Sequence, residues 1–118
     1  MLVIRREQWD EMQNSLNLEF ENRCLAELRA SYPEKLKDVD EDVLRDDVRG
    51  GLGKTGRFRL KDDGFIVEFL KYTVEYGRDF PDLEETLWAR EILDNGFLTE
   101  EQKMTALARH RTLEIMKD

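Results

Sequence analysis

The sequence contains few of the residues that cross-link a fold or bind metals, with one cysteine and one histidine among 118 residues. Cys24 alone cannot form a disulfide within the chain, which excludes a disulfide-stapled secreted scaffold and fits a reducing compartment. His110 lacks both an HExxH partner and the further cysteine or histidine that a zinc site needs. We therefore expect no metal site, and we place Cys24 in the hydrophobic core.

Long apolar runs are also absent. The uncharged stretches span only a few residues, whereas a membrane-spanning helix needs roughly 20 apolar residues. Met1 to Ile4 is followed at once by Arg5 and Arg6, which is not the pattern of a signal peptide. We expect a cytoplasmic protein with no membrane partner, in which Leu2 to Ile4 could lie as a short extended segment.

Charge is abundant. Hydrophobic residues make up 40% of the chain, charged residues 39%, and the net charge is −8. Such an acidic protein repels phosphate backbones, so nucleic acid is not an expected partner. The length suits one hydrophobic core, and we expect a single helical domain over residues 1–118.

Apolar residues recur every three or four positions, which predicts helices. The first helix runs from Arg6 to Ala30 and ends at Tyr32-Pro33, because proline disfavours the helical conformation of the residue before it. Asp40 can cap a second helix. That helix either stops near Gly50 or continues to Gly56 because close packing tolerates its glycines.

Three more helices are predicted by their end signals. One starts at Asp62-Asp63 and stops at Gly77, and a short one around Trp88 to Leu93 ends at Asn95-Gly96. Thr99 and Gln102 form a capping box that opens the last helix. The fold class is therefore an all-α compact bundle of about five helices with short loops.

Two motifs resemble ligand sites but are incomplete. Gly53-Lys54-Thr55 is like the end of a phosphate-binding loop, but Val48 stands where the first glycine belongs, and a helix precedes the motif instead of a strand. Asp38, Asp40 and Asp42 have calcium-loop spacing but lack the turn glycine and the final glutamate. We expect no cofactor, no catalytic residues and no enzymatic activity.

Acidic residues are concentrated between Asp62 and Glu101, a stretch that contains twelve acids and three bases. The negative charge of this stretch is larger than the net charge of the whole chain. Aromatic residues interleave with them and could anchor a protein partner, or could simply belong to the core. We expect Tyr72 and Tyr76 to be more exposed than Trp88. The predicted partner-binding residues are Tyr72, Tyr76, Arg78, Asp79, Phe80 and Asp82.

Several short segments carry a family resemblance across about four fifths of the chain. They are Ile4-Arg5, Glu7-Gln8, Phe20, Arg23, Leu28-Arg29, Tyr32-Pro33, Tyr76-Gly77-Arg78-Asp79-Phe80, Trp88-Ala89 and Ile92-Leu93. In their order and spacing the chain resembles small helical bacterial proteins encoded in type VI secretion effector clusters. The glycine-rich stretch Gly50 to Gly56, and Leu87 in place of a proline, depart from the family pattern.

The resemblance implies a non-enzymatic co-chaperone that binds an effector-loading chaperone, or the effector, and assists effector delivery. The alternative is an immunity protein whose acidic surface neutralises a toxin. A small nucleotide-binding protein is a weaker alternative. The long first helix could support a homo-oligomer.

Overall fold

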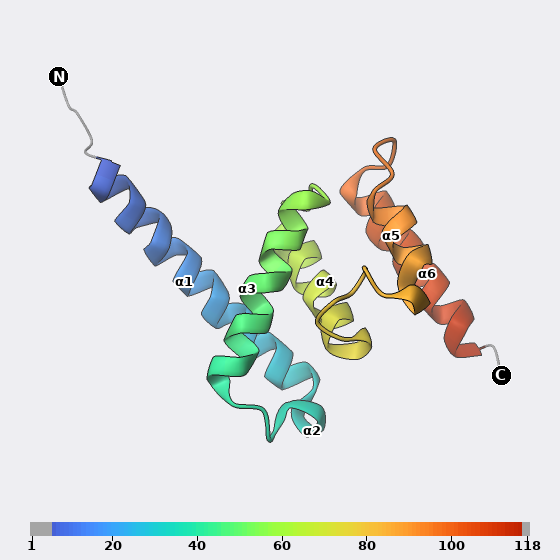
Figure 1. Ribbon diagram of the computed structural model, residues 1–118, viewed down its shortest axis with the longest axis horizontal. Helices are drawn as coiled ribbons and strands as arrows, with labels where there is room; N and C mark the ends of the chain where they lie inside the picture. Colours follow the sequence, from blue (N-terminus) through green and yellow to red (C-terminus); the bar gives the residue numbers. More distant parts are fainter. Residues whose placement is uncertain (1–5, 117–118) are drawn as a thin grey trace. The chain divides into compact units, whose positions relative to one another are not determined.

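The computed structural model describes the backbone of residues 6–116 and the side chains of residues 18–113 (Figure 1). The described chain is helical and contains no strand, which confirms the predicted all-α class. The elements are α1 (Arg6–Ser31), α2 (Pro33–Leu36), α3 (Glu41–Arg57), α4 (Asp63–Tyr76), the 3₁₀ turn η1 (Glu84–Thr86), α5 (Leu87–Leu93) and α6 (Glu100–Met116). The five predicted helices are present. The sequence analysis missed α2 and η1 because both are too short to show a helical period.

The chain divides into two compact units, Met1–Val48 and Arg49–Asp118, and the boundary falls inside α3. The expectation of a single domain stays a prediction. The extended segment expected at Leu2 to Ile4 lies outside the described residues. Of the helices that the structure describes, none has the length and apolar character needed to cross a membrane.

Arg29 connects α1 to the segment around α2 in the first unit. Its guanidinium donates to the carbonyl oxygens of Leu36 and Val39, both at 2.9 Å, and so ties α1 to the chain that follows α2. Arg45 of α3 bonds Glu21 at 3.0 Å and Asn22 at 2.8 Å, which links α3 to α1. Between these polar links lies a small apolar core. Its buried residues are Cys24, Leu25, Leu28, Leu36, Leu44 and Val48, which confirms the predicted burial of Cys24.

The helix ends of the second unit follow local side-chain chemistry. Asp62 accepts hydrogen bonds from the amides of Gly64 and Phe65 and so caps α4, which ends at Gly77 with a φ of 120°. Thr99 and Gln102 exchange the two bonds of a capping box at the start of α6, at 2.9 and 3.1 Å. These predicted helix ends are confirmed.

Helix α3 runs through its glycines to Arg57, so it does not stop near Gly50. The close packing expected for the other alternative is found at one of the four glycines only. A Cβ on Gly51 would collide with the side chain of Leu70, whereas one on Gly50, Gly53 or Gly56 would meet open space. The close approach of α3 and α4 at Gly51 therefore explains one glycine of the four.

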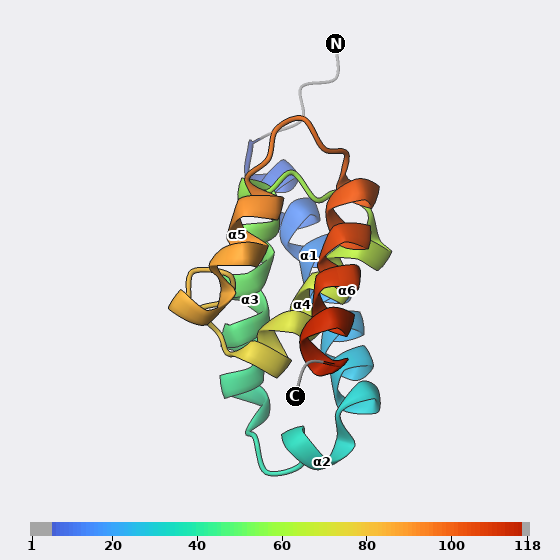
Figure 2. The same ribbon diagram turned by 90° about the vertical axis from the view of Figure 1, so that its right-hand side faces the viewer.

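Helix α6 packs against both α4 and α5 within the second unit, as Figures 1 and 2 show. The core beneath these contacts is apolar and rich in aromatic rings. Its most deeply buried members include Phe58, Phe69, Leu70, Phe80, Ala89, Leu93, Met104 and Leu107.

Candidate functional site at the loop between α4 and α5

The predicted partner-binding residues lie on α4 and on the loop that follows it, and an aromatic cluster supports them. This aromatic cluster consists of Phe58, Phe69, Tyr72, Tyr76, Phe80, Trp88 and His110. Phe80 is at its centre, with its ring centroid 5.6 Å from that of Phe69 and 5.5 Å from that of Tyr76. The contacts continue outward from Tyr76 to Trp88 at 6.1 Å. The cluster thus leads from the core of the second unit to its surface.

Lys54 of α3 fixes the backbone of the loop. Its Nζ atom donates to the carbonyl oxygen of Arg78 at 2.7 Å and to that of Phe80 at 2.9 Å. Thr55 directs its hydroxyl to the carbonyl oxygen of Leu52, at 2.6 Å within the same helix. The residues that resemble a phosphate-binding loop therefore have structural contacts, and they lie in a helix.

Asp82 forms the second anchor of the loop. Its carboxylate accepts from both terminal nitrogens of Arg57, at 2.9 and 3.2 Å, and Arg90 lies 3.7 Å away. The hydrogen bond from Arg57 holds the pKa of Asp82 below its ordinary value. Asp82 is a partly exposed member of an ion-pair network, which restricts its freedom to meet a partner.

Two of the six predicted contact residues are buried. Tyr72 is 5% exposed and Phe80 is fully enclosed, because both rings stack within the aromatic cluster, with centroids 5.6 Å apart. The expectation that Tyr72 is partly exposed is wrong, and neither ring is available as a direct contact. Tyr76 is half-buried, and Arg78 and Asp79 are exposed. The surface that remains is the loop itself and the outer edge of Tyr76.

The sequence analysis missed two neighbours of this surface, Leu87 and His110. The imidazole of His110 stacks on the indole of Trp88, with centroids 4.0 Å apart and planes 7° apart. Both rings are half-buried, and Leu87 is 49% exposed. Trp88 is thus more exposed than Tyr72, contrary to expectation. The spacing of Tyr76 and Trp88 in the sequence could not predict how exposed these two side chains are, because their exposure depends on packing against α6.

Burial dominates the electrostatics beneath the loop. Desolvation, reinforced by the nearby charge of Glu68, raises the pKa of Tyr72 to about 12. Burial also raises the pKa of Glu68, against the opposing effect of Lys71. At the outer side of α4, Arg111 bonds Glu75 through two short contacts of 2.6 and 2.7 Å, and this bond raises the pKa of the guanidinium. Tyr72 therefore stays neutral at physiological pH and serves as packing.

No group of three metal-ligating side chains occurs within the described residues. The Nδ1 atom of His110 is buried and has no hydrogen-bond partner among the described residues. The half-buried stack of Trp88 on His110 offers contact area, and the indole N–H of Trp88 already donates to the carbonyl oxygen of Glu85 at 3.1 Å.

Comparison with protein-family models, with curated proteins and with solved structures finds no match to this chain.

Proposed function

We propose that this protein is a non-enzymatic co-chaperone of type VI secretion, which binds an effector chaperone or its effector in the cytoplasm and assists effector delivery. The proposal combines the family resemblance of the sequence with one structural observation. That observation is the contact surface at the outer end of the aromatic cluster, made of Tyr76, Arg78, Asp79, Leu87 and Trp88.

The composition of this contact surface supports the proposal. Tryptophan, tyrosine and arginine are the residues that contribute most energy to protein interfaces. Tyr76 and Trp88 are half-buried and in edge-to-face contact at 6.1 Å. Rings held in this way lose little conformational entropy when they bind a partner.

The surrounding charge indicates the kind of partner. The stretch from Asp62 to Glu101 contains twelve acids and three bases. Asp79 within the contact surface is exposed, and so are Glu84 and Glu85, which precede Leu87 in the sequence. A field of one sign accelerates association with a partner of the opposite sign. We therefore expect a partner surface that is basic around an apolar centre.

The mechanism would use binding energy alone. A partner that is only marginally stable gains folding stability from a ligand that binds its native state. The contact surface would also cover apolar area on the partner until delivery. Such a role needs no catalytic residue.

An affinity purification from the native bacterium tests the proposal. The tagged protein should recover a secretion chaperone or its effector at moderate salt, as identified by mass spectrometry. The double variant Asp79→Lys with Leu87→Ser alters two exposed residues and should lose this partner. Asp38→Lys, an exposed acid in the first unit, should retain it. If the double variant recovered the same partner as the wild type, the contact surface would not be the binding site and this part of the proposal would be wrong.

A second candidate function is that of an immunity protein, and the acidity of the same surface favours it. An acidic protein can occupy the basic cleft of a toxin. Deletion of the gene separates the two functions, since loss of an immunity protein makes the producing cell poison itself. Loss of a co-chaperone should abolish effector delivery without self-intoxication.

A further inference from the structure

A pocket of about 440 Å³ opens in the second unit between the end of α3 and the start of α6. It is lined by Arg59, Lys61, Gly96, Leu98, Thr99, Glu100 and Lys103. Its volume lies in the range of small-molecule sites. Three basic side chains and one carboxylate thus line a cavity in a protein whose net charge is −8.

Lys103 is the buried basic residue of this pocket. It is 4% exposed, and its Nζ atom donates to the carbonyl oxygen of Phe58 at 2.9 Å. An ammonium group has three donors, so this bond leaves further hydrogen-bonding capacity. Desolvation lowers the pKa of Lys103 and the nearby charge of Arg59 lowers it further, while the charges of Asp94 and Glu100 oppose this shift. A buried lysine beside an arginine is an arrangement that a bound anion would stabilise.

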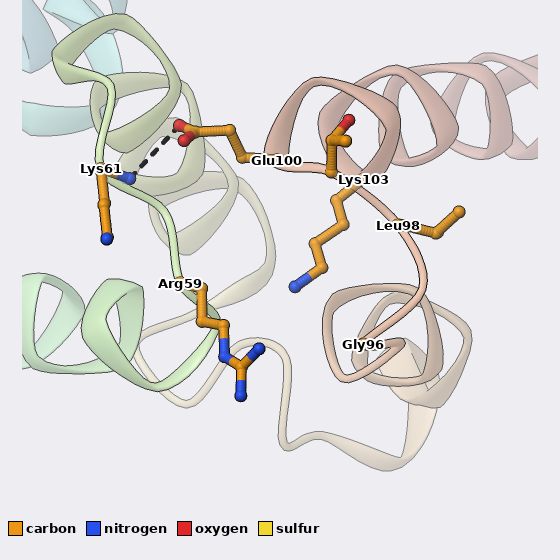
Figure 3. A pocket seen from close by; sticks show the side chains of 7 residues that line it. Arg59, Lys61, Gly96, Leu98, Glu100 and Lys103 are labelled. Atoms are coloured by element: carbon orange, nitrogen blue, oxygen red, sulfur yellow. Dashed lines mark hydrogen bonds between the residues drawn. The ribbon is translucent and has the colours of Figure 1, made fainter.

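Figure 3 shows Lys103 extending from α6 toward the segment that contains Arg59. The carboxylate of Glu100 turns to the backbone instead, where it accepts from the amides of Lys61 at 3.2 Å and Asp62 at 2.9 Å. Within the described part of the chain, the side chains of Arg59 and Lys61 form no salt bridge. The positive charges of the pocket are therefore only partly compensated.

Arg59 stands where a glycine is favoured. The amide of Leu60 bonds the carbonyl of Thr55, and that of Arg59 bonds the carbonyl of Gly56, which is the Schellman pattern of a helix end. Arg59 has the left-handed conformation at this end, with a φ of 62°. A side chain in this conformation costs free energy that glycine does not. Arg59, an exposed residue, therefore lines the pocket from a backbone position at which glycine is favoured.

We infer that this pocket binds a small phosphate-bearing molecule, with Arg59 and Lys103 as the groups that hold the phosphate. The pocket lining contains more cations than carboxylates, which favours an anion, and a phosphate monoester is a dianion near neutral pH. Arginine binds phosphate oxygens through paired hydrogen bonds, and lysine binds them as a point charge. This inference is independent of the proposed function, because the pocket does not include the contact surface.

Titration with inorganic phosphate, followed by two-dimensional amide NMR at constant ionic strength, tests the inference. The expected result is saturable shifts at Gly96, Thr99 and Lys103. Arg59→Gly removes the guanidinium and relieves the backbone, so the variant should fold at least as well as the wild type. It should bind phosphate about tenfold more weakly or worse, as expected for loss of a charge-assisted hydrogen bond.

Arg109→Gln is the matched control, because it removes one exposed positive charge from α6 outside the pocket. It should bind phosphate as the wild type does. Equal weakening by both variants would show general charge attraction and overturn the inference, as would shifts that do not saturate. Succinate at the same ionic strength is the carboxylate probe, and tighter binding of succinate than of phosphate would overturn the assignment to phosphate.

Discussion

Gly51 of α3 lies against the side chain of Leu70 of α4, so closely that a Cβ on Gly51 would collide with the Cδ2 methyl group of Leu70. Leu70 is fully buried, so a shift of its side chain would disturb its neighbours in the core. This contact explains why a glycine stands at position 51 in the interior of α3.

Gly51→Ala and Gly53→Ala should therefore have opposite effects. Gly53 is in the same helix but faces open space, so its replacement should stabilise the protein by about 0.5–1 kcal/mol through helix propensity. Gly51→Ala should destabilise it by about 1–3 kcal/mol, as overpacking does. Urea unfolding followed by circular dichroism measures both. A Gly51→Ala variant as stable as Gly53→Ala would contradict the close approach.

Lys54→Met should loosen the loop between α4 and α5. Removal of the ammonium group leaves the carbonyl oxygens of Arg78 and Phe80 without their donor, at an expected loss of about 1–2 kcal/mol in the free energy of unfolding. Amide exchange at Arg78 to Phe80 should become faster. Lys37→Met, at an exposed surface lysine, is the control and should change stability by no more than about 0.5 kcal/mol.

The same lysine tests the resemblance to a phosphate-binding loop. Lys54 and Thr55 already have hydrogen-bond partners within the protein. Calorimetric titration with ATP should therefore show no binding by the wild type that is lost in the variant Lys54→Met. Binding that depends on Lys54 would contradict the structural role of this residue and would support the nucleotide-binding alternative.

The sequence could predict features that depend on neighbouring residues. The capping box of Thr99 and Gln102 and the left-handed end at Gly77 are each decided within a few residues, and both were located correctly. The need for a glycine at position 51 could not be predicted from the sequence, since it depends on Leu70, a residue of another helix.

The surface was less predictable for the same reason. Tyr72 and Phe80 looked like contact residues because acids surround them in the sequence, yet they stack on each other in the interior. The pocket joins Arg59 to Lys103, which are far apart in the sequence. No spacing rule connects such residues, so only the packing of α6 brings them together.

Asp82→Asn should reduce stability by about 0.5–1 kcal/mol at neutral pH, a small value because the pair with Arg57 is partly exposed. The folded pKa of Asp82 is lowered, so its contribution is present above the ordinary value of 3.8 and disappears as pH falls through the folded pKa. Unfolding free energies measured against pH should therefore converge for variant and wild type in acid. Asp79→Asn is the exposed control, and a constant difference between Asp82→Asn and wild type at all pH values would contradict the ion pair.

Tyr72 should be visible in an alkaline titration of the tyrosine absorbance. The native protein should contain one phenol that ionises at about 12, which Tyr72→Phe removes, whereas all phenols of the denatured chain should titrate near 10. Between these two values the unfolded chain releases a proton that the folded chain retains, so the free energy of unfolding should fall as pH rises from about 10 to about 12. Below this window Tyr72 is neutral in both states and the effect vanishes. If every phenol of the native protein titrated near 10, Tyr72 would be at the surface. It would then again be a candidate for direct contact with a partner.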